Sequence, residues 1–250
     1  MAIPGEAVRP ESYDALLASA VWRDALDDLN QTLRQSLEAA GETPVLQGNV
    51  FYHSHQERFW EAAPDPEMEV KRRNLFIIAQ NATHLFEIGV NGGHSLLLML
   101  MANPALKAVG VDICQRVQKQ WAPVEVYTPV AGKWLEIHFP GRVRFITGNS
   151  LIETPRYAVE NPKRHIDAVH LDGAKVTHFR ELVSIRPVLT PDAFIVHDDT
   201  GIASVKKAIR QEEKLKMIRP VEPELGIVEN DYHRVYRNWD KVRGIADPAN

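Results

Sequence analysis

The chain has 250 residues, of which 44% are hydrophobic and 25% are charged, and its formal net charge at pH 7 is −4. This composition is typical of a globular protein, the length favours one domain with an extension, and the negative charge argues against a nucleic-acid partner. No apolar run is long enough to cross a bilayer, and the single cysteine excludes an intramolecular disulfide. Because the first residues also lack the pattern of a secretion signal, we expect a cytoplasmic protein without a membrane partner.

The first part of the chain, residues 1–66, is predicted to be a helical extension that precedes the main domain, residues 67–250. Apolar residues recur at helical spacing over residues 13–40, which predicts one or two amphipathic helices outside the sheet. Residues 43–66 mix aromatic and polar side chains. They could form a lid over a substrate or a contact between copies of the chain in a homo-oligomer.

From residue 84 onward, short apolar runs alternate with helical patterns, which predicts an α/β fold with a Rossmann-like, doubly wound and mainly parallel sheet. The predicted strands are residues 84–88, 108–111, 143–147, 167–171, 193–197, 217–221 and 233–236. The predicted helices among them are residues 95–102, 131–139, 176–185 and 202–213, and residues 67–81 form a further helix before the first strand. The basic run 71–73 on that helix is expected to face solvent. The linker 222–231 has no helical pattern, so we expect it to join an antiparallel pair.

The turn after the first predicted strand contains three glycines and is typical of a nucleotide-binding α/β sheet. Asn91 stands where a dinucleotide fingerprint needs its middle glycine, and the turn lacks the lysine of a phosphate-binding loop. Glu87, two residues before Gly89, would repel phosphate but could accept hydrogen bonds from ribose or attract a cation. A cofactor with a ribose and a positive charge, such as S-adenosylmethionine, therefore suits this turn better than NAD or ATP.

Carboxylates follow several of the predicted strands, and in a parallel sheet these ends meet at one edge. Asp112 follows the second strand, where adenosine-binding folds place an acid for the ribose diol. Asp172, Asp198 and Asp199 follow two further strands, and such a cluster needs a compensating cation. A divalent ion such as Mg²⁺ would suit the oxygen ligands, and beside it Lys175 could act as a base. Alternatively, Lys175 itself compensates the charge and no metal is needed.

The order and spacing of these motifs resemble a known family over about residues 67–239. The segments are Glu-Ile-Gly-Val at 87–90 with Gly93 and Ser95, Val-Asp at 111–112, Leu-Asp-x-x-Lys at 171–175, and Asp-Asp-Thr at 198–200. They look like the metal-dependent small-molecule O-methyltransferases of the catechol and caffeoyl-coenzyme A type, within the class I S-adenosylmethionine-dependent methyltransferases. The resemblance implies a seven-stranded sheet whose last strand is antiparallel.

The resemblance also implies roles for individual residues. Glu87 and Asp112 would contact the ribose region of the cofactor, and Asp172 would lie beside the cofactor as well as the metal. The methionine end of the cofactor would be lined by Gly89, Asn91, Gly93 and Ser95. The adenine would be flanked by Ile113, Asn149 and Ser150. A divalent metal, Mg²⁺ by expectation, would be held by Asp172, Asp198 and Asp199, the last at a position where that family usually has asparagine.

These residues predict methyl transfer from S-adenosylmethionine to a hydroxyl of a catechol-like or sugar-like small molecule, assisted by a divalent metal. Lys175 would be the general base. His178, one turn further along the same predicted helix, is a second candidate that could orient the substrate or replace Lys175 as base. Two alternatives stay open: a nicotinamide-dependent oxidoreductase, and a protein that binds S-adenosylmethionine without catalysis.

Overall fold

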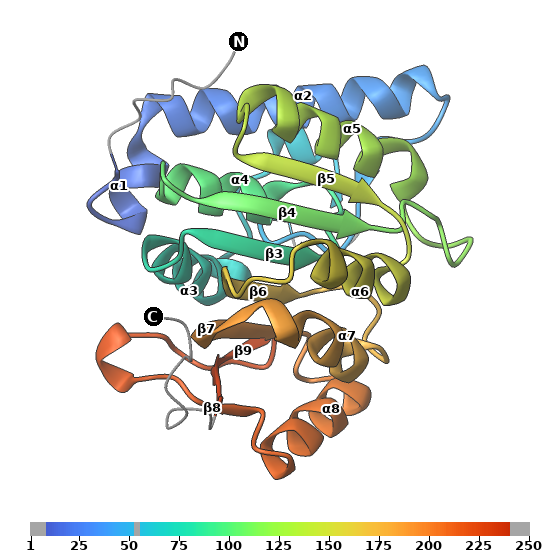
Figure 1. The fold of residues 1–250 in the computed structure, drawn as a ribbon. Helices are drawn as coiled ribbons and strands as arrows, with labels where there is room; N and C mark the ends of the chain where they lie inside the picture. The colour runs from blue at the N-terminus through green and yellow to red at the C-terminus, as the bar shows by residue number, and fades with distance from the viewer. Residues whose placement is uncertain (1–8, 53–55, 241–250) are drawn as a thin grey trace.

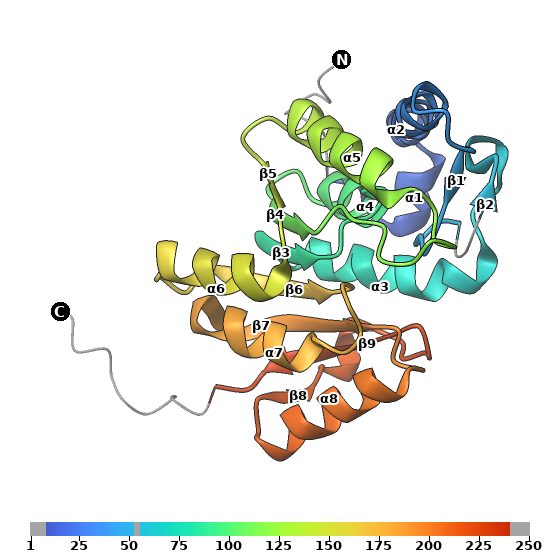
Figure 2. The same ribbon diagram turned by 90° about the vertical axis from the view of Figure 1, so that its right-hand side faces the viewer.

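The computed structural model describes residues 9–52 and 56–240, and a seven-stranded sheet runs through its centre (Figures 1 and 2). The strands lie in the order β5-β4-β3-β6-β7-β9-β8. All of the pairings are parallel except those of β9, which lies antiparallel between β7 and β8. Both the mainly parallel sheet and the antiparallel last strand are therefore confirmed. The strands are β3 (His84–Ile88), β4 (Lys107–Asp112), β5 (Val143–Thr147), β6 (Ile166–Leu171), β7 (Leu189–Asp198), β8 (Ile218–Pro220) and β9 (His233–Asn238).

Helices cover both faces of the sheet, because successive strand residues point to opposite sides and both sides are apolar. Leu85 of β3 belongs to the core that includes residues of α2, α3, α4 and α5, whereas its neighbour Phe86 belongs to the core beneath α6, α7 and α8. The helices of the first face are α3 (Glu69–Gln80), α4 (His94–Ala102) and α5 (Val124–His138). Those of the second face are α6 (Ser150–Glu160), α7 (His178–Ile185) and α8 (Ala203–Lys214).

The N-terminal segment packs on the first face, with α2 next to α5 (Figure 2). Side chains of α2, Leu29, Leu33 and Leu37 among them, are fully buried in the same core as Leu97 of α4. The apolar residues at helical spacing in residues 13–40 therefore form the side of α2 that packs against α4 and α5. The elements of this segment are α1 (Tyr13–Ala18), α2 (Ala20–Ala39), the short pair β1 (Val45–Leu46) and β2 (Gln56–Glu57), and the 3₁₀ turns η1 (Phe59–Glu61) and η2 (Pro66–Met68).

Two helices differ from the sequence prediction, and proline explains both. Helix α6, which contains Pro155, was not predicted. Helix α5, which contains Pro129, begins seven residues before the predicted start at 131. Proline disfavours a helix interior, so it masks the helical pattern around it. Two further 3₁₀ turns complete the chain: η3 (Arg186–Val188) and η4 (Pro223–Leu225). Among the described residues, no helix combines the length and apolar character needed to cross a membrane.

Candidate active site

A cavity of about 650 Å³ lies at the carboxyl ends of the parallel strands, where open α/β sheets bind their ligands. Most of the residues predicted for the site line it, and they come from the ends of β3, β4, β5, β6 and β7. These are Gly89, Asn91, Asp112, Ile113, Asn149, Ser150, Asp172, Lys175, Asp198 and Asp199. The sheet topology thus brings together residues that are up to 110 positions apart in the chain.

Asp112 holds the glycine turn in shape. One carboxylate oxygen accepts hydrogen bonds from the backbone N–H groups of Val90 (2.9 Å) and Asn91 (3.1 Å), and the other accepts one from Cys114 (2.8 Å). The side chain still lines the cavity, and each carboxylate oxygen has more than one lone pair. Asp112 can therefore both fix the turn and accept a hydrogen bond from a ligand.

Asn91 ties the glycine turn to the N-terminal segment and presents an unsatisfied acceptor. Its backbone has a positive φ of 52°, and its Nδ2 donates to the carbonyl oxygens of Gln47 (2.5 Å) and Gly48 (3.3 Å). Its Oδ1 is buried and has no hydrogen-bond partner within the described protein. A buried acceptor without a partner is costly, and a ligand donor such as an amino group would satisfy it. This half of the cavity thus fits a cofactor that carries an ammonium group.

The end of β5 supplies a second wall. Asn149 caps α6 by accepting a hydrogen bond from the N–H of Leu151 (2.9 Å), and Ser150 donates to Glu181 at 2.6 Å. The apolar side chain of Ile113, which is 37% exposed, lies on the same cavity. An apolar surface beside hydrogen-bonding groups suits a planar heterocycle.

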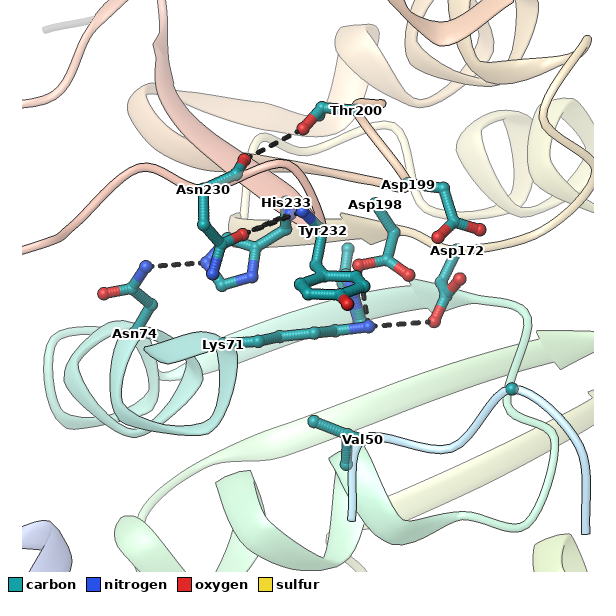
Figure 3. A network of polar contacts seen from close by, with 12 residues as sticks. Val50, Lys71, Asn74, Asp172, Asp198, Asp199, Thr200, Asn230, Tyr232 and His233 are labelled. Atoms are coloured by element: carbon teal, nitrogen blue, oxygen red, sulfur yellow. Dashed lines mark hydrogen bonds and ion pairs between the residues drawn. The ribbon is translucent and has the colours of Figure 1, made fainter. Parts of the chain in front are cut away.

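The acidic part of the cavity contains two lysines, Lys71 and Lys175, as well as three carboxylates; Figure 3 shows Lys71 with the three aspartates. The Nζ of Lys175 lies 2.5 Å from Asp172 Oδ1 and 3.1 Å from Asp199 Oδ2. Lys71, which reaches in from α3, places its Nζ 2.7 Å from Asp198 Oδ1 and 3.6 Å from Asp172 Oδ2. Asp172, Asp198 and Asp199 converge as predicted, but each of them already faces an ammonium group.

These pairings shift the pKa values of the group. Burial favours the neutral amine of Lys175, but the carboxylates of Asp172, Asp198 and Asp199 outweigh it and raise the lysine's pKa. Burial also acts against the charged form of Asp172, yet the two lysines hold the pKa of this carboxyl well below its usual range. Burial and then the charge of Asp172 raise the pKa of Asp198 to about 7. Lys175 is therefore a charged donor in this arrangement.

The predicted divalent ion has suitable ligands here but no room. Oxygen ligands suit Mg²⁺, which binds them at about 2.1 Å. In the described residues, His170, Asp172 and Asp198 place one ligand atom each within 4.8 Å of one another; Nδ1 of His170 is bonded to Glu87, and its Nε2 is buried without a hydrogen-bond partner. The ammonium of Lys71 lies between Asp172 and Asp198, where such an ion would have to bind. The residues as arranged do not fit a resident divalent ion.

Lys71 corrects the sequence prediction for the basic run 71–73. We expected a solvent-facing stretch, but Lys71 is 5% exposed and Arg72 is 3% exposed. The guanidinium of Arg72 donates to the Tyr13 hydroxyl and to the carbonyls of Val50 and Asp65. Each of the two buried cations is thus surrounded by acceptors, which is what makes their burial tolerable.

The structure places four predicted residues away from the cavity, which corrects their roles. Glu87 is fully buried and its Oε1 lies 2.7 Å from Nδ1 of His170, so it does not reach a cofactor. His178 is also fully buried and packs beside His197, so it cannot meet a substrate as a base. Gly93 and Ser95 lie at the start of α4, behind the turn, and do not line the cavity.

Gly89 is the position at which the site depends most on glycine. Its φ is +87°, and an added Cβ would lie 2.6 Å from the backbone carbon and oxygen of Asp172. We expect Gly89→Ala to lower the free energy of unfolding by at least about 2 kcal/mol, measured by urea denaturation. Gly141→Ala is the matched control, since Gly141 has a φ of +72° and open space around its Cβ. Equal losses in the two variants would show that the close approach to Asp172 carries no cost.

Comparisons with known proteins agree with this geometry. A family model described as a methyltransferase domain matches residues 86–200, the span from β3 to the end of the acidic rim. No curated protein matches the chain.

Several solved structures share the fold. The O-methyltransferase TomG from Streptomyces achromogenes, involved in tomaymycin synthesis and solved with SAM, is 14% identical with a TM-score of 0.54, over 85% of this chain and 90% of that chain. Cofactor-bound Rv0187 from MTB is 17% identical with a TM-score of 0.54, over 92% and 97%. An O-methyltransferase from Bacillus cereus in complex with SAH is 16% identical with a TM-score of 0.51, over 84% and 91%. At these identities the likeness shows the fold.

The model of a methyltransferase domain thus matches residues 86–200 of this chain, and the whole sheet has the fold of the solved structures, in agreement with the methyltransferase predicted from the motifs.

Proposed function

We propose that the protein is an S-adenosylmethionine-dependent O-methyltransferase that methylates a hydroxyl of a small molecule. The observation that carries the proposal is that one cavity joins the glycine turn after β3 to a rim of lysines and carboxylates. The methyltransferase-domain match over residues 86–200 supports it, as do the SAM- and SAH-bound proteins that share the fold. The cavity volume, about 650 Å³, is in the usual range for small-molecule sites.

The cofactor would lie along β3, β4 and β5. The carboxylate of Asp112 would accept from its ribose hydroxyls, and Oδ1 of Asn91 would accept from its amino group. Ile113, Asn149 and Ser150 would enclose the adenine. S-adenosylmethionine supplies a methyl group on a sulfonium, and the acidic rim beyond Gly89 is the side of the cavity that attracts a positive charge.

Lys175 and Asp199 would handle the acceptor hydroxyl. The Lys175 ammonium donates a hydrogen bond to the acceptor oxygen and so stabilises its oxyanion form. The hydroxyl proton passes to Asp199, whose side chain is 40% exposed and can return the proton to water. The oxygen then takes the methyl group, the O–CH₃ bond forms as the S–CH₃ bond breaks, and the thioether leaves. Positioning of the oxygen behind the methyl group is the cavity's other contribution.

The role of Lys175 thus differs from the predicted one. The sequence-based hypothesis made it a base whose pKa a metal lowers, whereas its carboxylate neighbours raise that pKa and keep the amine protonated. We assign no step to a metal. The small hydroxylated substrate, the homo-oligomer and the cytoplasmic location all stay predictions.

Isothermal titration tests the proposal. We expect S-adenosylmethionine and S-adenosylhomocysteine to bind with one site per chain, and NADH to give no heat. Asp112→Asn removes the charge and replaces one of the two acceptor oxygens by an NH₂ donor, so it should weaken the binding of S-adenosylmethionine by about tenfold or more. Transfer of a labelled methyl group to a panel of catechols and sugars would then identify the acceptor. Binding of NADH without binding of S-adenosylmethionine would instead support the oxidoreductase, and cofactor binding with no transfer to any acceptor would support the non-catalytic alternative.

A further inference from the structure

Lys71 reaches the acidic rim from a helix outside the strand-end motifs. Its side chain extends from α3 and ends between Asp172 and Asp198 (Figure 3). Only 7% of the side chain is exposed, so the ammonium is shielded from solvent. Lys175 contacts the other side of Asp172 and also Asp199. The Nζ of Lys175 also lies 4.0 Å from Oδ2 of Asp198, so both ammonium groups face Asp172 and Asp198, from opposite oxygens of each carboxylate.

The helix that carries Lys71 is anchored on both sides. Arg72 bonds to the carbonyls of Val50 and Asp65 in the N-terminal segment. Asn74, one turn along α3, donates to the Val228 carbonyl at 2.6 Å and lies 2.7 Å from Nε2 of His233. These contacts hold the backbone beneath Lys71 in place, so the ammonium is a built feature of the cavity rather than a surface side chain that happens to fold inward.

A divalent ion and the Lys71 ammonium would compete for one place. An ion bound to both Asp172 and Asp198 would have to lie about 2.1 Å from an oxygen of each. The ammonium already lies 2.7 Å from Oδ1 of Asp198 and 3.6 Å from Oδ2 of Asp172, between the same two carboxylates. Two cations at such close range would repel each other strongly in a buried site.

The charge count also favours the lysine. When all three carboxyls are ionised, three carboxylates and two ammonium groups leave one net negative charge on the rim. A cofactor sulfonium, with its single positive charge, would neutralise this remainder. A divalent ion added to the same rim would leave it positive and would oppose the approach of the sulfonium.

We infer that Lys71 is a resident cation of the acidic rim, in the place where the sequence predicted a divalent metal. The site then needs no metal. Only the claim that activity needs no metal rests on the proposed function. Whether Lys71 occupies the rim can be measured without any enzymatic turnover.

Binding of Mn²⁺, followed by electron paramagnetic resonance and by isothermal titration, tests the inference directly. We expect wild-type protein to show no stoichiometric Mn²⁺ site. Lys71→Gln and Lys71→Met remove the ammonium and keep the three carboxylates, so each should gain a site that binds Mn²⁺ more than about tenfold tighter than wild type. Mg²⁺ should compete for it. Lys207→Gln, at an exposed position on α8, is the control for loss of one lysine charge and should behave like wild type.

Two results would overturn the inference. One is a stoichiometric Mn²⁺ site in the wild-type protein, and the other is the absence of such a site in whichever Lys71 variants keep the wild-type circular dichroism spectrum. If neither variant folds, the wild-type measurement together with turnover in excess chelator decides: activity that EDTA abolishes and Mn²⁺ restores would refute the inference. Binding of S-adenosylmethionine in the presence of EDTA is measured in parallel. A failure of the wild-type protein to bind this cofactor would refute the proposed function but not the inference about Lys71.

Discussion

Replacement of Lys175 by alanine is expected to reduce kcat by about two to four orders of magnitude while S-adenosylmethionine still binds. The side chain is 21% exposed and lies at the cavity, with its Nζ between Asp172 and Asp199. Because the ammonium would stabilise the oxyanion that attacks the methyl group, its loss should raise the barrier of the chemical step. Single-turnover transfer of a labelled methyl group, with cofactor affinity from titration, separates the two effects.

The control for this variant is Lys207→Ala, which removes an exposed lysine from α8 and should leave kcat unchanged. A circular dichroism spectrum and an unfolding curve close to those of the wild type would exclude a folding defect in Lys175→Ala. A Lys175→Ala enzyme that turns over within about tenfold of the wild type would show that Lys175 does not touch the reacting oxygen.

The convergence of the carboxylates could be predicted because it depends only on strand ends. Asp112, Asp172 and Asp198 each follow or end a short apolar run, and parallel strands end at one edge whatever the connections between them. Each strand can be recognised from the apolar pattern of its own residues, without knowledge of which strands it pairs with. The predicted succession of strands from β3 to β9 was accordingly correct, although helix α6 was missed.

Glu87 shows where strand-end reasoning fails. It stands one position before the end of β3, between Phe86 and Ile88, which both face the core beneath α6 and α7. Alternation along the strand therefore turns Glu87 toward the α3 face, where the parallel register places it opposite His170. Applying the alternation of side chains strictly along β3 would have placed the Glu87 carboxylate between the sheet and α3 rather than at the cavity.

Lys71 and His178 could not be placed from local patterns. A Lys-Arg-Arg run on a helix usually faces solvent, and only the packing of α3 against the sheet brings Lys71 beneath the acidic rim. For His178, the prediction assumed one helix through Lys175, whereas α7 begins only at His178, after a turn that contains Lys175. The register between the two side chains is then set by the turn and not by helical spacing.

Asp198→Ala is expected to lower the free energy of unfolding by about 3 to 5 kcal/mol, because it removes one partner of a buried ion pair. Asp198 is 4% exposed and its Oδ1 lies 2.7 Å from the ammonium of Lys71, whose next carboxylate oxygen, on Asp172, is 3.6 Å away. The substitution would leave Lys71 buried with a weaker counterion. Urea unfolding followed by circular dichroism gives the loss.

A double-mutant cycle assigns that loss to the pair. Adding Lys71→Met to Asp198→Ala removes the uncompensated charge, so the double variant should be more stable than Asp198→Ala alone, with a coupling energy of about 2 kcal/mol or more. Asp199→Asn is the control, since its carboxylate belongs to the same rim but is 40% exposed and asparagine tolerates the positive φ of 53° at this position; it should cost no more than about 1 kcal/mol. If Lys71→Met and Asp198→Ala instead destabilise the protein additively, the two side chains do not interact in the folded state, and the rim is held together by Lys175 alone.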